Sequence, residues 1–147
     1  MTTAFKTLLD TVSAALLEAP ALAGGRVYVG RDNATPLDQA SDVNLTLQTQ
    51  DGQPFALTAG PTDWTVDVGV EIRARGSDST DAVAAIDPLL ELAYARLVAM
   101  VLPAGVSGIT GFRGQIDVQE AGVPFAAWQF LLTINFRTAP GSLALAP

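Results

Sequence analysis

The chain has 147 residues, of which 49% are hydrophobic and only 16% are charged, and its net charge is −7. It contains no Cys and no His, which excludes disulfides, thiol nucleophiles, Cys- or His-based zinc sites and the imidazole of most acid–base catalysts. The negative charge disfavours attraction to DNA and to anionic membranes, and no stretch reaches the ~20 apolar residues that span a bilayer.

The first elements in chain order are a helix and three short strands. Residues 3–18 place apolar side chains at three- and four-residue spacing, which is typical of an amphipathic helix. Alternating patterns then predict strands, separated by a polar loop at 31–42, at 26–30, 43–50 and 53–59. Asp51-Gly52 suits the type I′ turn of a hairpin between the last two of these strands.

Two long strands are the clearest signal in the chain. In residues 64–75 the apolar side chains, such as Val66 and Val68, alternate with polar ones, such as Asp67 and Arg73. Residues 125–138 repeat the pattern. Because successive side chains of a strand point to opposite faces, each strand is predicted to have one buried and one polar face.

A second helix is predicted at 77–102, with Asp78 and Asp81 at its start, where a carboxylate can cap free amides. Pro88 predicts a kink or restart, with Asp87 as a local cap. A strand at 109–120 would form a terminal hairpin with residues 125–138. Residues 139–147 hold no charge and are predicted to be a flexible tail that trails over the surface or onto a neighbour.

These elements predict a single α+β domain over residues 1–138. Its sheet is expected to be mixed but mostly antiparallel, with two main helices on one face. Two helices cannot cover both faces, so the second face is left for solvent or another subunit. The low charge, below the ~25% of a typical domain, also indicates that neighbours cover part of the surface.

No catalytic, cofactor or metal site is predicted, and we do not expect an enzyme. Capping explains the pair Asp78 and Asp81, and a polar strand face explains Asp67 and Glu71, whereas tuned carboxylates need burial and convergence. The glycines at 105–114 precede a strand and form no phosphate-binding motif. The Trp and Phe residues mostly lie on apolar strand faces, which favours core packing over base stacking.

Four features of the chain together resemble a known family. They are the N-terminal helix, the strand that begins at Trp64 and contains VDVGVEIRARG, the Ala- and Leu-rich helix, and the hairpin segments GQIDVQEAG and FAAWQFLLTINFRT. The family is the tail terminator, or tail completion, family of long-tailed bacteriophages and related tail-like particles, and the resemblance covers residues 3–138. It implies a virion protein at the head–tail junction, assembled in the host cytoplasm, that forms a ring, usually a hexamer. The ring would stack on the last ring of tail-tube protein, stop tube growth and face the head–tail connector. DNA would pass through its acidic lumen without specific binding, and no membrane would be involved.

Subunit contacts are hypothesised on the polar strand faces. The candidate residues are Asp67, Glu71, Arg73, Arg75, Arg113, Asp117 and Arg137. The loop at 31–42, which begins with Arg31 and Asp32, is the candidate for touching the tube or the connector, because loops on rigid scaffolds carry contacts. A solvated strand face is the plain alternative for each of these residues.

Other functions stay open at this stage. The chain could be another structural part of the same particle, such as a head–tail connector, tube or baseplate subunit. A different class is a small homo-oligomeric enzyme with an inter-subunit site of Asp, Glu and Arg, and a third is a small-molecule-binding domain.

Overall fold

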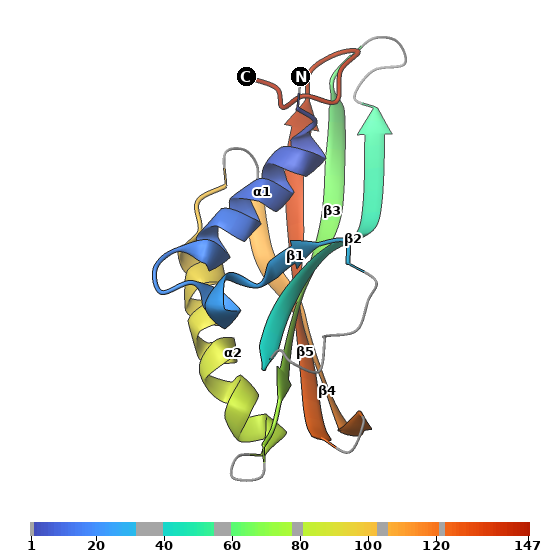
Figure 1. Ribbon diagram of the computed structural model, residues 1–147. Helices are drawn as coiled ribbons and strands as arrows, with labels where there is room; N and C mark the ends of the chain where they lie inside the picture. The colour runs from blue at the N-terminus through green and yellow to red at the C-terminus, as the bar shows by residue number, and fades with distance from the viewer. Residues whose placement is uncertain (1, 32–39, 55–59, 78–80, 103–105, 121–122) are drawn as a thin grey trace.

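Five strands form one sheet that carries both main helices on the same side (Figure 1). The computed structural model describes residues 2–31, 40–54, 60–77, 81–102, 106–120 and 123–147. The strands, in the spatial order β1-β2-β3-β5-β4, are β1 Val27–Val29, β2 Ser41–Pro54, β3 Thr62–Arg75, β5 Val123–Thr138 and β4 Val106–Glu120. β1 runs parallel to β2, and all other neighbours are antiparallel. This confirms the predicted α+β fold with a mixed, mostly antiparallel sheet.

The core lies between this sheet and the helices α1, Ala4–Leu17, and α2, Ala82–Ala99. The apolar stripe of α1 and the apolar face of β3, with Leu8 and Val68 as examples, are fully buried. Each such side chain contributes about 1.5–3 kcal/mol by leaving water. The predicted helix at 3–18 therefore forms α1, and the predicted strands at 64–75 and 125–138 form β3 and β5. The alternation of apolar and polar residues in these two strands determines which face of the sheet meets the helices.

Arg96 joins the two helices. From α2 its Nη1 donates to the carbonyl oxygen of Leu16 at 2.7 Å, and its Nη2 donates to that of Pro20. The last carbonyls of a helix lack partners and carry partial negative charge, so a guanidinium there is favourable. A short 3₁₀ turn, η1 Leu22–Gly25, then leads into β1.

The predicted turn at Asp51-Gly52 is wrong. Both residues lie inside β2, where Asp51 pairs with Thr65 and Gly52 with Trp64. A Cβ on Gly52 would lie 2.6–2.8 Å from three atoms of the Trp64 ring. Gly52 is therefore needed because the indole lies against its backbone, and not because a turn needs positive φ. The predicted strand at 53–59 falls mostly on residues 55–59, outside the described part.

α2 begins later than predicted, with Asp81 as its cap. The Asp81 Oδ1 accepts a hydrogen bond from the amide nitrogen of Ala84 at 2.7 Å. This satisfies one of the free amides in the first turn. Asp78, the other predicted cap, lies outside the described residues.

Of the kink or restart predicted at Pro88, the restart does not occur, because α2 runs through Pro88 as one helix. Ile86 and Ala93, one on each side of Pro88, are both fully buried. Tertiary packing of the buried face supplies most of a helix's stability, and here it outweighs the hydrogen bond that proline cannot donate.

The C-terminal segment folds back on its own domain, where the sequence predicted a trailing tail. Leu145 forms a bridge with Thr138 at the end of β5, and the Ala146 amide donates to the carbonyl oxygen of Arg137 at 2.9 Å. The Leu143 carbonyl oxygen accepts from the Ala4 amide at 2.8 Å, which caps the start of α1. The two chain ends accordingly lie side by side (Figure 1).

Candidate interaction surface

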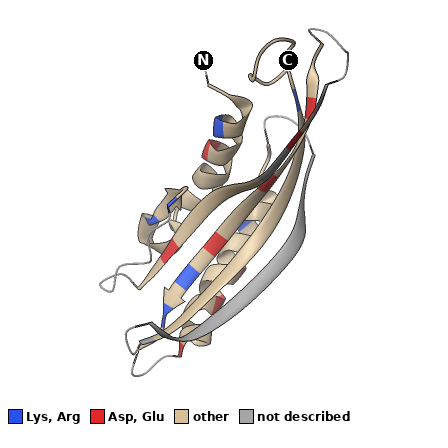
Figure 2. Ribbon diagram, turned by 90° about the vertical axis from the view of Figure 1, so that its right-hand side faces the viewer, with Lys and Arg blue, Asp and Glu red and all other residues tan. Residues whose placement is uncertain are grey.

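We call the side of the sheet away from α1 and α2 the open face. Its residues alternate along β2, β3 and β5 with the buried apolar ones. They are Asp42, Asn44, Thr46, Asp63, Thr65, Asp67, Gly69, Glu71, Arg73, Arg75, Gln129, Leu131, Thr133, Asn135 and Arg137. Figure 2 looks onto this face, where acidic and basic segments lie close together on neighbouring strands.

At one end of the open face Asp63 and Arg137 form a bidentate pair between β3 and β5. The Arg137 Nε donates to Asp63 Oδ1 at 2.6 Å, and Nη2 donates to Oδ2 at 2.9 Å. These hydrogen bonds hold the pKa of Asp63 below its ordinary value and raise the pKa of Arg137. Both side chains are about half exposed, so solvent screens the pair and its contribution to stability is small.

Two further pairs link the same strands by side-chain hydrogen bonds. The Thr133 hydroxyl donates to Asp67 Oδ1 at 2.7 Å, and the Thr65 hydroxyl donates to Asn135 Oδ1 at 2.8 Å. Directly opposed pairs of this kind are the unit by which antiparallel strands stabilise one another. The open face of β3 and β5 is thus tied together within the subunit.

At the other end Asp42 is fully buried between two arginines. Its Oδ1 accepts from Arg73 Nε at 2.8 Å, and its Oδ2 lies 3.9 Å from Arg31 Nη1. Glu71 Oε1 lies 3.5 Å from the same Arg73 nitrogen. A buried carboxylate needs such partners because an unpaired buried charge is strongly unfavourable.

Asn44 extends this cluster to the edge strand β1. Its side-chain amide both accepts from the Arg31 amide at 3.0 Å and donates to the Arg31 carbonyl oxygen at 2.8 Å. The Arg31 guanidinium also lies 4.4 Å above the ring of Tyr28 in β1. The residues that follow β1 are therefore held against β2 by side chains as well as by backbone pairing.

Gly69 lies at the centre of the open face and leaves room for side chains from both flanking strands. A Cβ there would lie 2.5 Å from Gln48 Nε2, 2.6 Å from Gln129 Nε2 and 2.9 Å from Thr46 Oγ1. The amide ends of two glutamines thus cover the backbone of β3 at this point, and Gly69 itself is buried.

The structure brings some of the predicted residues together and keeps others apart. Arg31, Glu71 and Arg73 surround Asp42. Arg137 lies in β5 beside Asp63, at the other end of β3, and Asp63 is ten residues, or roughly 33 Å, from Arg73 along that strand. Asp67 lies between these two ends of β3 and accepts a hydrogen bond from the Thr133 hydroxyl. No single convergent site is formed by these described residues.

The remaining predicted residues are less accessible or lie outside the description. Arg75 is only 8% exposed, and its guanidinium lies 5.5 Å from the centre of the Phe125 ring. Arg113 and Asp117 lie in β4, in register with Gln129 and Phe125 of β5, and their side chains are outside the described part. Asp32 is outside it altogether.

Sequence reasoning missed Asp42 and Asp63 as partners of the predicted arginines. The sequence pattern places Asp42 at the end of the loop at 31–42, although it begins the alternation that continues through Val43 and Asn44. Asp63 directly precedes Trp64, the start of the predicted strand. The alternation could have placed both carboxylates on the polar face, but their partners depend on strand register.

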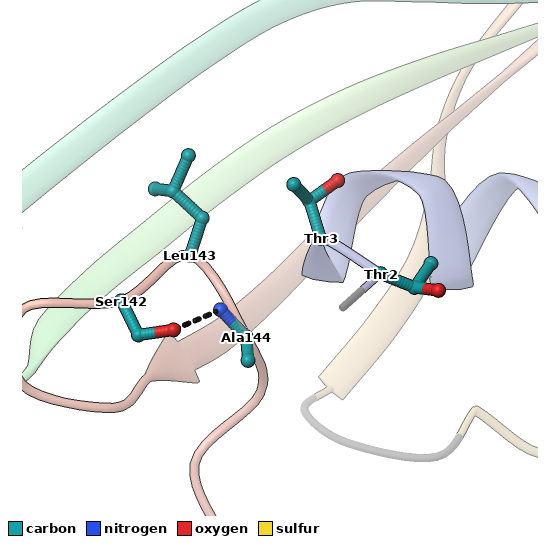
Figure 3. Close-up of a pocket in the computed structure, with 5 residues that line it drawn as sticks. All are labelled: Thr2, Thr3, Ser142, Leu143 and Ala144. Atoms are coloured by element: carbon teal, nitrogen blue, oxygen red, sulfur yellow. Dashed lines mark hydrogen bonds between the residues drawn. The ribbon is translucent and has the colours of Figure 1, made fainter.

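A pocket of about 220 Å³ lies between the start of α1 and the C-terminal segment (Figure 3). It is lined by Thr2, Thr3, Ser142, Leu143 and Ala144. Two of its three hydroxyl oxygens already accept backbone hydrogen bonds, Thr3 Oγ1 from Lys6 and Ser142 Oγ from Ala144. The pocket is therefore the seam where the two chain ends meet.

Over the described ranges, the acidic side chains form no group of three or more that could hold a metal ion. Within the same ranges, no helix is both long enough and apolar enough to cross a membrane. Comparison of the chain with protein-family models and with curated protein sequences gave no match.

Proposed function

We propose that this chain is a structural subunit of a phage-like tail. Copies of it form a ring, hexameric as in the family that the sequence resembles, which caps the tail tube, stops its polymerisation and joins the tail to the head–tail connector. The observation that carries the proposal is the one-sided sheet, in which two helices cover one face and the polar open face is internally bonded.

The open face suits the wall of a channel through which DNA moves. It presents the carboxylates of Asp67 and Glu71, and its arginines Arg73 and Arg137 are already bound to carboxylates of the same subunit. A passing phosphate backbone would meet negative charge and neutralised cations. The net charge of −7 adds long-range repulsion, so DNA would slide past this wall without the counterion release that drives binding.

The cross-strand bonds also suit a part that must keep its shape under mechanical load. Asp63–Arg137, Thr133–Asp67 and Asp42–Arg73 each tie one strand to the next. A closed ring needs two different, complementary sides on every subunit, and a stiff sheet holds those sides at a constant angle. The tail-tube protein, the connector and the position at the head–tail junction of the virion rest on the family resemblance.

The test is the mass of the purified protein in solution, measured with and without isolated tail tubes, together with negative-stain electron microscopy. We expect a discrete ring, either free or at one end of each tube, and tubes that grow no further once it is bound. Long tubes built from this protein alone would identify a tube subunit instead. A monomer that ignores tube ends under every condition would refute the ring.

A further inference from the structure

The sheet edge formed by β1 and β2 is covered at one end and open at the other. β1 pairs only with Val43–Leu45. It ends there because Gly30, with a φ of 64°, turns the chain away, and the Asn44 side chain holds the next residue, Arg31, by two hydrogen bonds. β2 continues over residues 46–54 (Figure 1), and among the described residues no strand pairs with its outer side in that stretch.

β4 forms the other edge of the sheet. It has 15 residues, whereas a typical strand has about five or six. One side of β4 pairs with β5, and within the described part of the chain no strand pairs with the other side. A long open edge is a template for a further strand unless charge or proline protects it. The charged residues Arg113, Asp117 and Glu120 all lie in the second half of β4, and residues 106–111 hold neither a charge nor a proline.

The two open stretches lie at the same height in the sheet. Strand register across β3 and β5 puts residues 46–51 of β2 level with residues 106–111 of β4. Asp51 is the only charged residue in either stretch. Each stretch contains one bulge, at nearly the same height, so the two strands bend together. The protected parts also match, because β1 covers β2 where β4 carries its charges.

The strand directions match as well. β2, β3, β5 and β4 alternate strictly in direction, so β2 and β4 run antiparallel to one another. Subunits of a ring are related by rotation alone. With the strands along the channel, β4 of one copy therefore meets β2 of the next at the same height and in the antiparallel direction. This contact is heterologous, as a closed ring requires, and closing the ring leaves neither stretch open.

We propose that residues 46–51 of β2 form an antiparallel ladder with residues 106–111 of β4 in a second copy of this chain, so that the sheets of the ring are joined edge to edge. The inference rests on the proposed function and adds the surface by which subunits join. It moves the subunit contact from the charged strand faces to the backbone groups at the edges of the sheet.

Hydrogen exchange followed by mass spectrometry tests the ladder on the unmodified protein. The outward amides of residues 46–51 and 106–111 should exchange at least about tenfold more slowly in the assembled ring than in dissociated protein, because they become hydrogen-bonded. Residues 113–120 of β4 are the internal control and should exchange equally in both states. Protection of one stretch alone, of neither, or of residues 113–120 to the same extent would overturn the inference.

The backbone N–H of Gln50 is the group to remove. The Val43 amide donates and the Leu45 carbonyl oxygen accepts on the side of β1, so the odd-numbered residues of β2 direct their backbone groups outward there. The bulge after Leu47 adds one residue to β2. Beyond the bulge the even-numbered residues therefore face outward, and the Gln50 N–H takes no part in the ladder with β3.

Gln50→Pro should weaken subunit association by at least about tenfold, because proline has no N–H and its ring obstructs an approaching strand. Gln50→Ala keeps the N–H and should assemble as the original protein does. The exchange measurement needs no variant, so it decides the question if Q50P does not fold. Rings of Q50P as stable as those of Q50A would overturn the inference alone. Absence of rings from the original protein would overturn the proposed function.

Discussion

Gly52→Ala is expected to destabilise the protein more than a glycine-to-alanine substitution in a strand ordinarily does. The new Cβ would lie 2.6–2.8 Å from three ring atoms of Trp64, where an ordinary carbon–carbon contact is about 3.5–4.0 Å. The indole would have to move by roughly 1 Å. It cannot do so freely, because its Nε1 donates to the Thr138 hydroxyl at 3.1 Å and its ring packs edge-on against Phe5 at 5.0 Å between centroids.

The expected cost is the sum of three effects less one gain. Overpacking costs about 1–3 kcal/mol, and strain on the indole hydrogen bond and on the ring pair adds about 1 kcal/mol. Alanine recovers roughly 0.5 kcal/mol of chain entropy relative to glycine. The net loss is about 1.5–3.5 kcal/mol, which lowers the melting temperature of a chain this size by roughly 5–11 °C.

Urea denaturation of G52A beside Gly69→Ala would measure this loss with a matched control. A Cβ at Gly69 also meets close neighbours, but two of these are the flexible amide ends of Gln48 and Gln129, which can rotate away. G69A should change the free energy of unfolding by no more than about 0.5 kcal/mol. In a Trp64→Leu background the effect of G52A should largely vanish, which a double-mutant cycle would show as coupling of about 2 kcal/mol. Equal effects of G52A and G69A would refute the reasoning.

The remaining predictions concern charge and capping. Asp42→Asn should cost about 3 kcal/mol in urea denaturation because it leaves the Arg73 guanidinium without its buried carboxylate; replacing both residues by Leu should recover most of that loss. Nuclear magnetic resonance titration should find the pKa of Asp63 below 3.8 and show its return to the ordinary value in Arg137→Leu. Because folding lowers this pKa, the pair's small contribution is present above pH ~3.8 and is lost as the pH falls through the folded-state pKa. Asp81→Ala should cost about 1 kcal/mol of stability, measured by thermal denaturation, through loss of the α2 cap.

The sequence predicts the secondary structure correctly where the local pattern and the tertiary structure agree. The alternation of residues 64–75 and 125–138 predicted β3 and β5, because a strand against a layer of helices needs one apolar face over its whole length. The prediction of a turn at Asp51-Gly52 is wrong because a dipeptide preference is local. The pairing of Gly52 with Trp64 depends instead on the position of β3. A restart, one of the two outcomes predicted at Pro88, does not occur for the same reason, since packing on the sheet carries the helix through the proline.

The surface was less predictable than the fold, because its contacts join residues far apart in the chain. The open face itself follows from the alternation, and the expectation that Arg73 and Arg137 lie on it agrees with the register. Their partners do not follow, since Asp42–Arg73 spans 31 residues and Asp63–Arg137 spans 74. A shift of one strand by a single residue would put each partner on the opposite face. The mostly apolar sequence of α2 does not show which side of the helix is exposed, and the exposed fractions of Val83, Tyr94 and Val98 identify that side.

The buried cluster around Asp42 fixes the register of the strands more than it stabilises the protein. A buried ion pair gains little net free energy, because desolvation offsets most of the attraction. What it does provide is a single register: Arg73 can reach Asp42 only if β2 and β3 pair as observed, and Arg31 can reach it only if the chain after β1 lies where Asn44 holds it. The open face is thereby defined within one subunit, where Arg73 and Arg137 are already paired with carboxylates of that subunit. In a ring, Arg73 and Arg137 on such a face need no carboxylate from a neighbour, so the cohesion between subunits has to come from other surfaces.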